Sequence, residues 1–427
     1  MTTSAIAEHN LAARLGDAGD FAGAIAACAR AIALGGTAPE TYLVQARALQ
    51  GLHQLDEAEA AYAQAIARRA DYAVAHRDLA QLRWMRSGDA RHAMAMLDRA
   101  PDTADLALVR ATVLTGVGEV ARAAQVLDRA LDRAPDAVAL RLAAAGVAGQ
   151  LGRASAQLDH ATAALRAAPA SIDAARAAVE ALLHLGRIGE AAALAERVVA
   201  AAPNDQAAIA LMATAWRLAG DARHAALCED PALVRTATIA TPAGWRDLPA
   251  YLADLATALD TLHGWRTHPL EQSIRHGSQT QVDLSTVETP VIAALFAAFD
   301  APIRAHIAAL GAGGDPVRRR ARGGYRIAGA WSVRLMPGGF HTDHVHPAGW
   351  LSSAFYVALP DAVATPPQGW LAFGRPGGPT VPALAPFRHV RPEPGMLALF
   401  PSYLWHGTEP FTGDAPRLTV AFDLVPA

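Results

Sequence analysis

The sequence predicts a two-part α+β protein, with repeated helix pairs in its N-terminal half and an antiparallel β domain in its C-terminal half. Three observations predict this: landmarks that recur about every 34 residues, a composition change after Cys228, and short alternating apolar runs from Tyr325 onward. The length of 427 residues agrees, because single cores usually stop growing near about 250 to 300 residues. We expect a helical-repeat domain over residues 1–228 and a β domain with N-terminal helices over residues 229–427.

Prolines and small residues mark the repeat in the first half. Pro135, Pro169 and Pro203 each follow an Ala-rich helical stretch, at intervals of 34 residues. A short turn followed by a helix-opening residue, usually small, recurs at intervals of 34, 35, 30, 34, 34 and 34 residues. The residues at this position are Ala24, Ala58, Ala93, Ala123, Gln157, Ala191 and Ala225. This period, with small residues and a closing proline, resembles the tetratricopeptide repeat over most of residues 1–228.

The resemblance implies an α-solenoid, in which each helix pair stacks on its neighbours to bury its apolar face and the stack forms a groove. Such grooves usually hold peptides or proteins, so we expect a peptide or protein partner. The sequence departs from the family because its aromatic positions are mostly Ala or Leu here, and Gln157 replaces a small residue. As an alternative, the helices brace the C-terminal domain or mediate self-association, because a fold alone does not determine function.

The composition excludes several kinds of chemistry. All 37 basic residues are arginine, so a Walker P-loop, a pyridoxal-phosphate Schiff base and a lysine general base are excluded. The net charge of −3 argues against a nucleic-acid partner. Cys28 and Cys228 alone make neither a disulfide framework nor a cysteine zinc site. With no signal-peptide pattern and no uninterrupted apolar run of about 20 residues, we expect no membrane partner and a cytoplasmic location.

The second half changes from helical to β patterning along its length. Helices are expected over residues 249–262 and 290–310. Short apolar runs punctuated by Gly and Pro then follow: YRIAGAWSVRL, WLSSAFYVALP, GWLAFG, GMLALFP and RLTVAFDLV. Runs of this length and spacing indicate an antiparallel β-sandwich or barrel of the jelly-roll kind.

Metal-ligand side chains are densest in residues 337–347, which read PGGFHTDHVHP. On a strand, His344 and His346 project together, while His341 and Asp343 project to the opposite face unless a bulge intervenes.

A third candidate ligand, His406, lies 60 residues after His346 at the end of an apolar strand, and Arg417 follows eleven residues later. This is the spacing of the non-haem iron facial site, where three protein ligands leave one face of Fe(II) for a chelating co-substrate and O₂. The rigid fork of an arginine suits the distal carboxylate of such a co-substrate.

Three stretches together resemble the 2-oxoglutarate and Fe(II)-dependent oxygenases, in the branch whose first motif reads H-x-H-P. They are GGFHTDHVHPAGWLSSAFYVALP, GWLAFGRP and RPEPGMLALFPSYLWHGTEPFTGDAPRLTVAFD, with the upstream HPLEQSIRHGSQT also similar. The resemblance covers about residues 250–427. It implies a double-stranded β-helix (jelly-roll) fold and a dioxygenase that uses Fe(II), 2-oxoglutarate and O₂ to hydroxylate its substrate. Fused to the repeats, it implies a hydroxylase of peptides or proteins.

By this resemblance His344 is the first metal ligand, His346 stands where aspartate is usual, and His406 is the distal ligand. Arg417 then binds the carboxylate of 2-oxoglutarate. The further co-substrate candidates on the strand after the first motif are Tyr356 and Ser353.

Several alternatives remain open at the level of the sequence. Three imidazoles would leave the charge of Fe(II) uncompensated, so His341, Asp343 and His406 form a second possible ligand set. We prefer the first set because Gly339 and Phe340 then stand at the family's usual distance before the first ligand. The domain could also be a catalytically silent part of a scaffold, or an oxygenase of small molecules. Asp423 and Glu409 could tune the site from behind the ligands.

Overall fold

The computed structural model describes residues 3–427 and divides into two compact units. The first comprises the residues up to Ala143 together with Pro269–Glu271, and the second comprises Ala144–His268 and Gln272–Ala427. The predicted boundary at residue 228 lies within the second unit, and it stays a prediction.

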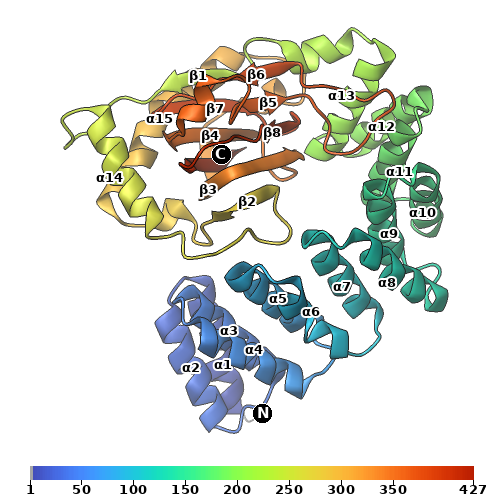
Figure 1. The fold of residues 1–427 in the computed structure, drawn as a ribbon, viewed down its shortest axis with the longest axis vertical. Helices are drawn as coiled ribbons and strands as arrows, with labels where there is room; N and C mark the ends of the chain where they lie inside the picture. The colour runs from blue at the N-terminus through green and yellow to red at the C-terminus, as the bar shows by residue number, and fades with distance from the viewer. Residues whose placement is uncertain (1–2) are drawn as a thin grey trace. The chain divides into compact units, whose positions relative to one another are not determined.

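Paired helices joined by short turns build the first unit, and successive helices pack on one another (Figure 1). They are α1 (Thr3–Asp17), α2 (Phe21–Ala33), α3 (Pro39–Gly51), α4 (Leu55–Arg68), α5 (Ala73–Ser87), α6 (Ala90–Met94), α7 (Ala104–Gly116) and α8 (Val120–Arg133). The division between the units falls within α9 (Val138–Gln150). The helical-repeat class that the sequence predicts is therefore confirmed.

The turn inside each helix pair depends on one left-handed residue. Gly88 ends α5 with φ 68°, and Gly118, Gly152 and Gly186 have similar positive φ values at the same place in later repeats. Glycine adopts this conformation without the steric cost of a Cβ atom. His53 takes the position in the second pair with φ 60°. These turns recur with the period read from the sequence.

Small residues let the paired helices approach closely. Ala24, Ala58 and Ala123 are fully buried, as the repeat pattern requires. Gln157 occupies the same position and is also buried, and its side-chain oxygen lies 2.9 Å from Nδ1 of His184. A Cβ atom on Gly149 would collide with this amide, so a glycine makes the room that the larger residue needs.

The third helix pair is shorter than the others. Its second helix, α6, has five residues and is followed only by a 3₁₀ turn, η1 (Leu97–Arg99), whereas α4 and α8 have 14 residues each. The stretch 90–99 covers ten residues, four fewer than α4, and this difference of about one helical turn corresponds to the interval of 30 residues in the sequence.

The second unit continues the helix pairs and then forms a sheet (Figure 1). The helices are α10 (Ala154–Ala167), α11 (Ile172–His184), α12 (Ile188–Ala201), α13 (Gln206–Ala219), α14 (Leu248–Asp260) and α15 (Pro290–Leu310). The strands are β1 (Arg235–Thr238), β2 (Ile274–Gln279), β3 (Tyr325–His344), β4 (Leu351–Ala358), β5 (Leu371–Phe373), β6 (Arg388–Val390), β7 (Met396–Pro401), β8 (His406–Thr408) and β9 (Arg417–Pro426).

The nine strands form one curled antiparallel sheet. Its order is β1-β7-β4-β9-β3-β8-β5-β6, with β2 paired to β3. This arrangement is compatible with the jelly roll that the sequence predicts. Phe299 of α15 lies in the core beside the sheet, with its ring 5.1 Å from Phe355 and 4.9 Å from Phe422. Burial of one such side chain stabilises the domain by roughly 1.5 to 3 kcal/mol.

Among the helices of residues 3–427, one, α15, is long and apolar enough to cross a membrane by length and composition alone, with a mean hydropathy of 1.5. Ile292, Leu295, Phe299 and Ile303 of this helix are nevertheless buried in the domain core. Packing against the sheet accounts for these apolar residues.

Strand β3 changes its pairing partner along its length. It pairs with β9 as far as Leu335 and with β8 from His341. Between these stretches Gly339 has no room for a side chain, because a Cβ atom there would lie 2.6 Å from the carbonyl oxygen of His276. A glycine at this position lets β3 pass close to β2 and carry the histidines onto the curled sheet.

Candidate metal centre

Three imidazole rings converge where β3 ends and β8 begins. The potential ligand atoms of His344, His346 and His406 all lie within 4.8 Å of one another. The Nε2 atoms of His344 and His346 are 3.1 Å apart, and the ring centroids of His344 and His406 are 4.3 Å apart. The structure thus brings together the three residues that the sequence singles out as the preferred ligand set.

In each ring the nitrogen that faces away from the cluster, Nδ1, already makes a hydrogen bond. Nδ1 of His344 lies 2.8 Å from the carbonyl oxygen of Thr342, and Nδ1 of His406 lies 2.9 Å from that of Leu404. Carbonyl oxygens only accept, so both Nδ1 atoms must donate, and in the neutral ring the lone pair is then on Nε2. This arrangement fixes the tautomer as metal-ligating histidines require.

His346 is held in the same way by a carboxylate. Its Nδ1 lies 2.6 Å and 2.8 Å from the two oxygens of Asp423 on β9. Ser352 donates a further hydrogen bond of 2.7 Å to the same carboxylate, and the ring of Trp331 stacks on His346 at 5.9 Å. The sequence offered Asp423 only as a candidate, because its contact with His346 depends on β9, and it gave no sign that Trp331 lies against this imidazole, because that contact depends on the course of β3.

Burial keeps the imidazoles of His344 and His406 neutral. It lowers the pKa of His344 to about 3, with His346 adding to the effect, and it holds the pKa of His406 well below its usual range. Neutral imidazole is the form that binds a metal. In the tautomers described above, the Nε2 lone pairs of His344 and His346 face each other at 3.1 Å, an arrangement that a cation between them would stabilise. The donor set therefore fits a divalent transition metal.

A bulge alters the expected distribution of side chains on β3. His341 pairs with Thr408 and His344 pairs with His406, so three steps along β3 match two along β8. As a result His341 lies on the same side as His344, with their rings 6.1 Å apart. Nδ1 of His341 lies 3.1 Å from the hydroxyl oxygen of Thr408. His341 is therefore a neighbour of the three-histidine cluster, outside its ligand geometry.

The carboxylate of Asp343 pairs with Arg375 and not with the three-histidine cluster. One oxygen of its carboxylate accepts a hydrogen bond of 2.5 Å from Arg375, and Arg375 also pairs with Glu409 at 3.1 Å. Burial raises the pKa of Asp343, and Arg375 opposes that shift. The alternative ligand set of His341, Asp343 and His406 is thus not the set that the structure gathers.

Arg417 is buried beside the site without a carboxylate partner. Its side chain is 2 % exposed, its Cζ atom lies 5.0 Å from the centre of the Tyr356 ring, and its Nε atom has no hydrogen-bond acceptor. Across residues 3–427, no acidic side chain lies within ion-pair distance of this guanidinium. Arg417 pairs with Leu335 on β3, the strand that carries His341 and His344, and its charge contributes to lowering the pKa of His341. A buried cation of this kind requires an anionic partner.

The two candidates on β4 differ in their surroundings. The hydroxyl of Tyr356 is buried and lacks a hydrogen-bond partner, so it is available to a ligand. The hydroxyl of Ser353 both donates to the carbonyl of Phe422 and accepts from the amide of Phe422, at 2.9 Å each. Ser353 thus joins β4 to β9, and we leave it out of the co-substrate site proposed below.

Fold and site together define a helical-repeat protein whose β domain has a three-histidine candidate metal centre. Within that domain, residues 329–423 match the family model described as "Putative 2OG-Fe(II) oxygenase". This part of the β domain is thus similar to the 2-oxoglutarate/Fe(II) oxygenases, as the sequence motifs predict, and it follows the helix pairs that resemble tetratricopeptide repeats. No curated protein matches the sequence.

Solved structures resemble the chain at low identity. A tetratricopeptide repeat protein from Parabacteroides merdae ATCC 43184 is 16% identical, with a TM-score of 0.39, over 52% of this chain and 90% of its own. PilW, a type IV pilus biogenesis factor, is 17% identical with a TM-score of 0.39, over 50% of this chain and 100% of its own. YrrB, described as a TPR protein with an unusual peptide-binding site, is 19% identical with a TM-score of 0.32, over 43% of this chain and 95% of its own. The repeat architecture itself rests on the helix pairs of this chain.

Proposed function

We propose that the β domain is a 2-oxoglutarate- and Fe(II)-dependent dioxygenase that hydroxylates its substrate. The observation that carries this proposal is the convergence of three imidazoles, with Nδ1 already hydrogen-bonded in each, close to a buried arginine that has no carboxylate partner. The family match over residues 329–423 supports it.

In this proposal His344, His346 and His406 hold Fe(II) through their Nε2 atoms, and Arg417 pairs with the distal carboxylate of 2-oxoglutarate. Bound iron would supply the redox chemistry in which O₂ converts 2-oxoglutarate to succinate and CO₂ while one oxygen atom enters a C–H bond of the substrate. The residues of the chain position these groups and keep water out of a largely buried site. Tyr356 packs beside Arg417 and offers its hydroxyl to the same carboxylate.

We also propose that the repeats bind the substrate as a peptide or protein segment. The support is the stacked helix pairs, which offer an extended surface for such a ligand. A cytoplasmic location and the absence of nucleic-acid and membrane partners remain predictions from composition.

Release of succinate tests the enzymatic proposal. Protein reconstituted with Fe(II) and supplied with 2-oxoglutarate and O₂ is expected to form succinate, and the variant His406→Ala is expected to lose this activity. The matched control is His92→Ala, which removes a partly exposed histidine of the repeat domain and should retain activity. If folded, iron-supplemented protein forms no succinate with any fraction of a cell extract, the scaffold alternative is favoured.

A further inference from the structure

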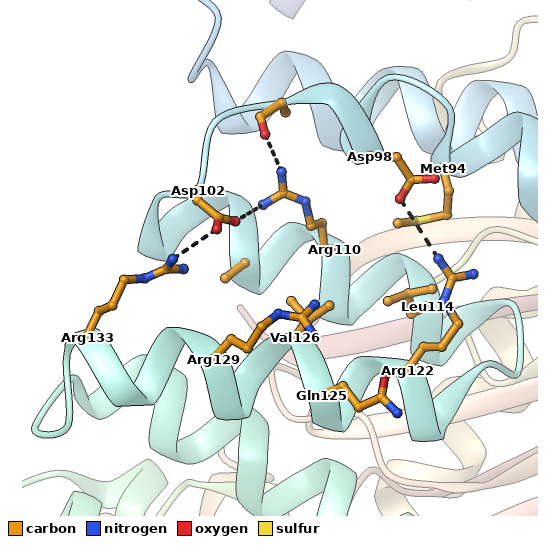
Figure 2. A pocket seen from close by; sticks show the side chains of 12 residues that line it. Met94, Asp98, Asp102, Arg110, Leu114, Arg122, Gln125, Val126, Arg129 and Arg133 are labelled. Carbon is orange, nitrogen blue, oxygen red and sulfur yellow. Dashed lines mark hydrogen bonds and ion pairs between the residues drawn. The ribbon is translucent and has the colours of Figure 1, made fainter.

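The shortened third helix pair leaves a pocket in the first unit. The pocket has a volume of about 390 Å³ and lies between η1 with its following loop on one side and α8 on the other, with α7 as its floor (Figure 2). A full-length second helix in this pair, like the 14-residue α4, would extend about one turn further along this side. The pocket therefore follows from the interval of 30 residues in the repeat.

The charged side chains that line this pocket are four arginines and two aspartates. Arg110 is buried and holds the wall, because it donates to the carbonyl oxygens of Leu97 at 3.0 Å and Ala100 at 2.5 Å. The other three arginines are exposed and lie on α8. They are Arg122, Arg129 and Arg133.

The two aspartates compensate this charge only in part. Asp102 lies 2.9 Å from Arg133 and 3.4 Å from Arg110, and Asp98 lies 3.9 Å from Arg122, which also pairs with Glu119 just before α8. Arg129 lies between these pairs, and within residues 3–427 no carboxylate lies within ion-pair distance of it (Figure 2). Solvent-exposed pairs of this kind contribute only about 0 to 1 kcal/mol, so an incoming anion can displace them. The pocket keeps an excess of positive charge.

The three exposed arginines lie on one face of α8. Positions 122, 129 and 133 are seven and four residues apart, so their side chains project in nearly the same direction. From Arg122 to Arg133 the helix advances about 16 Å, at about 1.5 Å per residue. A single phosphate or sulfate cannot reach all three, whereas about five residues of extended peptide span this length at about 3.3 Å per residue.

We propose that this pocket binds an extended acidic peptide segment whose carboxylates pair with Arg122, Arg129 and Arg133. Arginine forks bind carboxylates with two parallel hydrogen bonds, which suits glutamate and aspartate side chains. Met94, Leu114 and Val126 line the pocket between the charges and contact the aliphatic parts of the peptide. This binding site is independent of the proposed oxygenase chemistry.

The test uses the full chain and a fluorescein-labelled penta-glutamate peptide with blocked ends, with fluorescence anisotropy as the readout. The wild-type protein is expected to bind this peptide and to bind the matched penta-glutamine peptide at least about tenfold more weakly. Arg129→Gln is expected to weaken binding about tenfold, because Arg129 has no ion-pair partner within the pocket. The triple variant Arg122→Gln/Arg129→Gln/Arg133→Gln should lose measurable binding.

Arg14→Gln is the matched control, because it removes one exposed arginine of the same unit at α1 and should leave binding unchanged. Circular dichroism of each variant checks that the helices are intact. The proposal is overturned if the folded wild-type chain does not bind the peptide, or if Arg129→Gln and Arg14→Gln behave alike. It is also overturned if inorganic phosphate or a short RNA competes at lower concentration than the unlabelled peptide does.

Discussion

Asp423 binds His346 from behind the candidate metal centre, with both carboxylate oxygens within 2.8 Å of the imidazole Nδ1. The carboxylate that a ligand set of three histidines lacks is thus present one hydrogen bond away, on β9. A histidine that donates to a carboxylate is a stronger metal ligand, because the negative charge increases the electron density at Nε2. The cluster therefore gains part of the charge compensation that an aspartate ligand would give.

This relationship predicts the effect of removing the charge of Asp423. Asp423→Asn keeps the size of the side chain but not its negative charge, so the affinity for Fe(II) should fall about 10- to 100-fold. Anaerobic titration with Fe(II) measures it. Glu409→Gln is the control, since Glu409 pairs with Arg375 and His389 instead, and it should bind iron as the wild type does. Equal affinities in the two variants would contradict a role for Asp423.

The two ligand sets can be separated by substitution. His346→Ala should abolish binding of Fe(II), because it removes one of three converging Nε2 atoms. Asp343→Ala should retain iron binding, although loss of its ion pair with Arg375 should reduce thermal stability. Metal content after reconstitution distinguishes the two. The reverse pattern, with iron lost from Asp343→Ala and retained in His346→Ala, would make the alternative set correct.

Arg417→Gln should remove the partner of the co-substrate while leaving the metal ligands in place. We expect about a 100-fold loss of 2-oxoglutarate affinity, because a charge-assisted pair in a buried site contributes roughly 2 to 3 kcal/mol. Calorimetric titration of the iron-loaded protein under nitrogen measures this. Arg326→Gln, an exposed arginine at the far end of β3, is the control. Unchanged 2-oxoglutarate affinity in Arg417→Gln would show that the carboxylate binds elsewhere.

A buried histidine makes stability depend on pH. The ring nitrogens of His263 lie 2.9 Å and 3.0 Å from the hydroxyls of Ser278 and Ser332, and burial lowers its pKa to about 4 from an ordinary value of 6.5. Between these values the unfolded chain binds a proton that the folded chain does not, so the free energy of unfolding falls as the pH is lowered through this window. The contribution reaches at most about 3 kcal/mol below pH 4.

His263→Gln should therefore show a weaker loss of stability between pH 6.5 and pH 4 than the wild type, in urea unfolding experiments. His92→Gln, which changes a partly exposed histidine, should follow the wild type. An unchanged pH dependence in His263→Gln would mean that other groups determine it.

Local chemistry made much of the molecule predictable from the sequence. The repeat can be read directly from two local features. They are the turn glycines, such as Gly118, and the buried alanines, such as Ala123. The spacing of His344, His346 and His406 was sufficient to find the cluster, because side-chain alternation and strand pairing bring them together.

What the sequence missed depends on contacts between distant segments. The pairing of β4 with β9 turns Ser353 to the backbone of Phe422, so its hydroxyl is not a free co-substrate ligand. The indole of Trp405, next to the candidate ligand His406, donates to Thr214 of α13, a contact that no local sequence pattern predicts. Trp331 lies fifteen residues before His346, and only the course of β3 places its ring against that imidazole.

Anaerobic binding tests the central claim most directly. Fe(II) is titrated into the protein under nitrogen, and 2-oxoglutarate is then added while visible absorption is recorded. A site in which His344, His346 and His406 hold iron beside Arg417 predicts one Fe(II) per chain and a visible charge-transfer band that appears only with 2-oxoglutarate. The band should be absent in His406→Ala and should need far more 2-oxoglutarate in Arg417→Gln. No band from a folded wild-type protein that has bound iron, or an equal band in His406→Ala, would contradict the account.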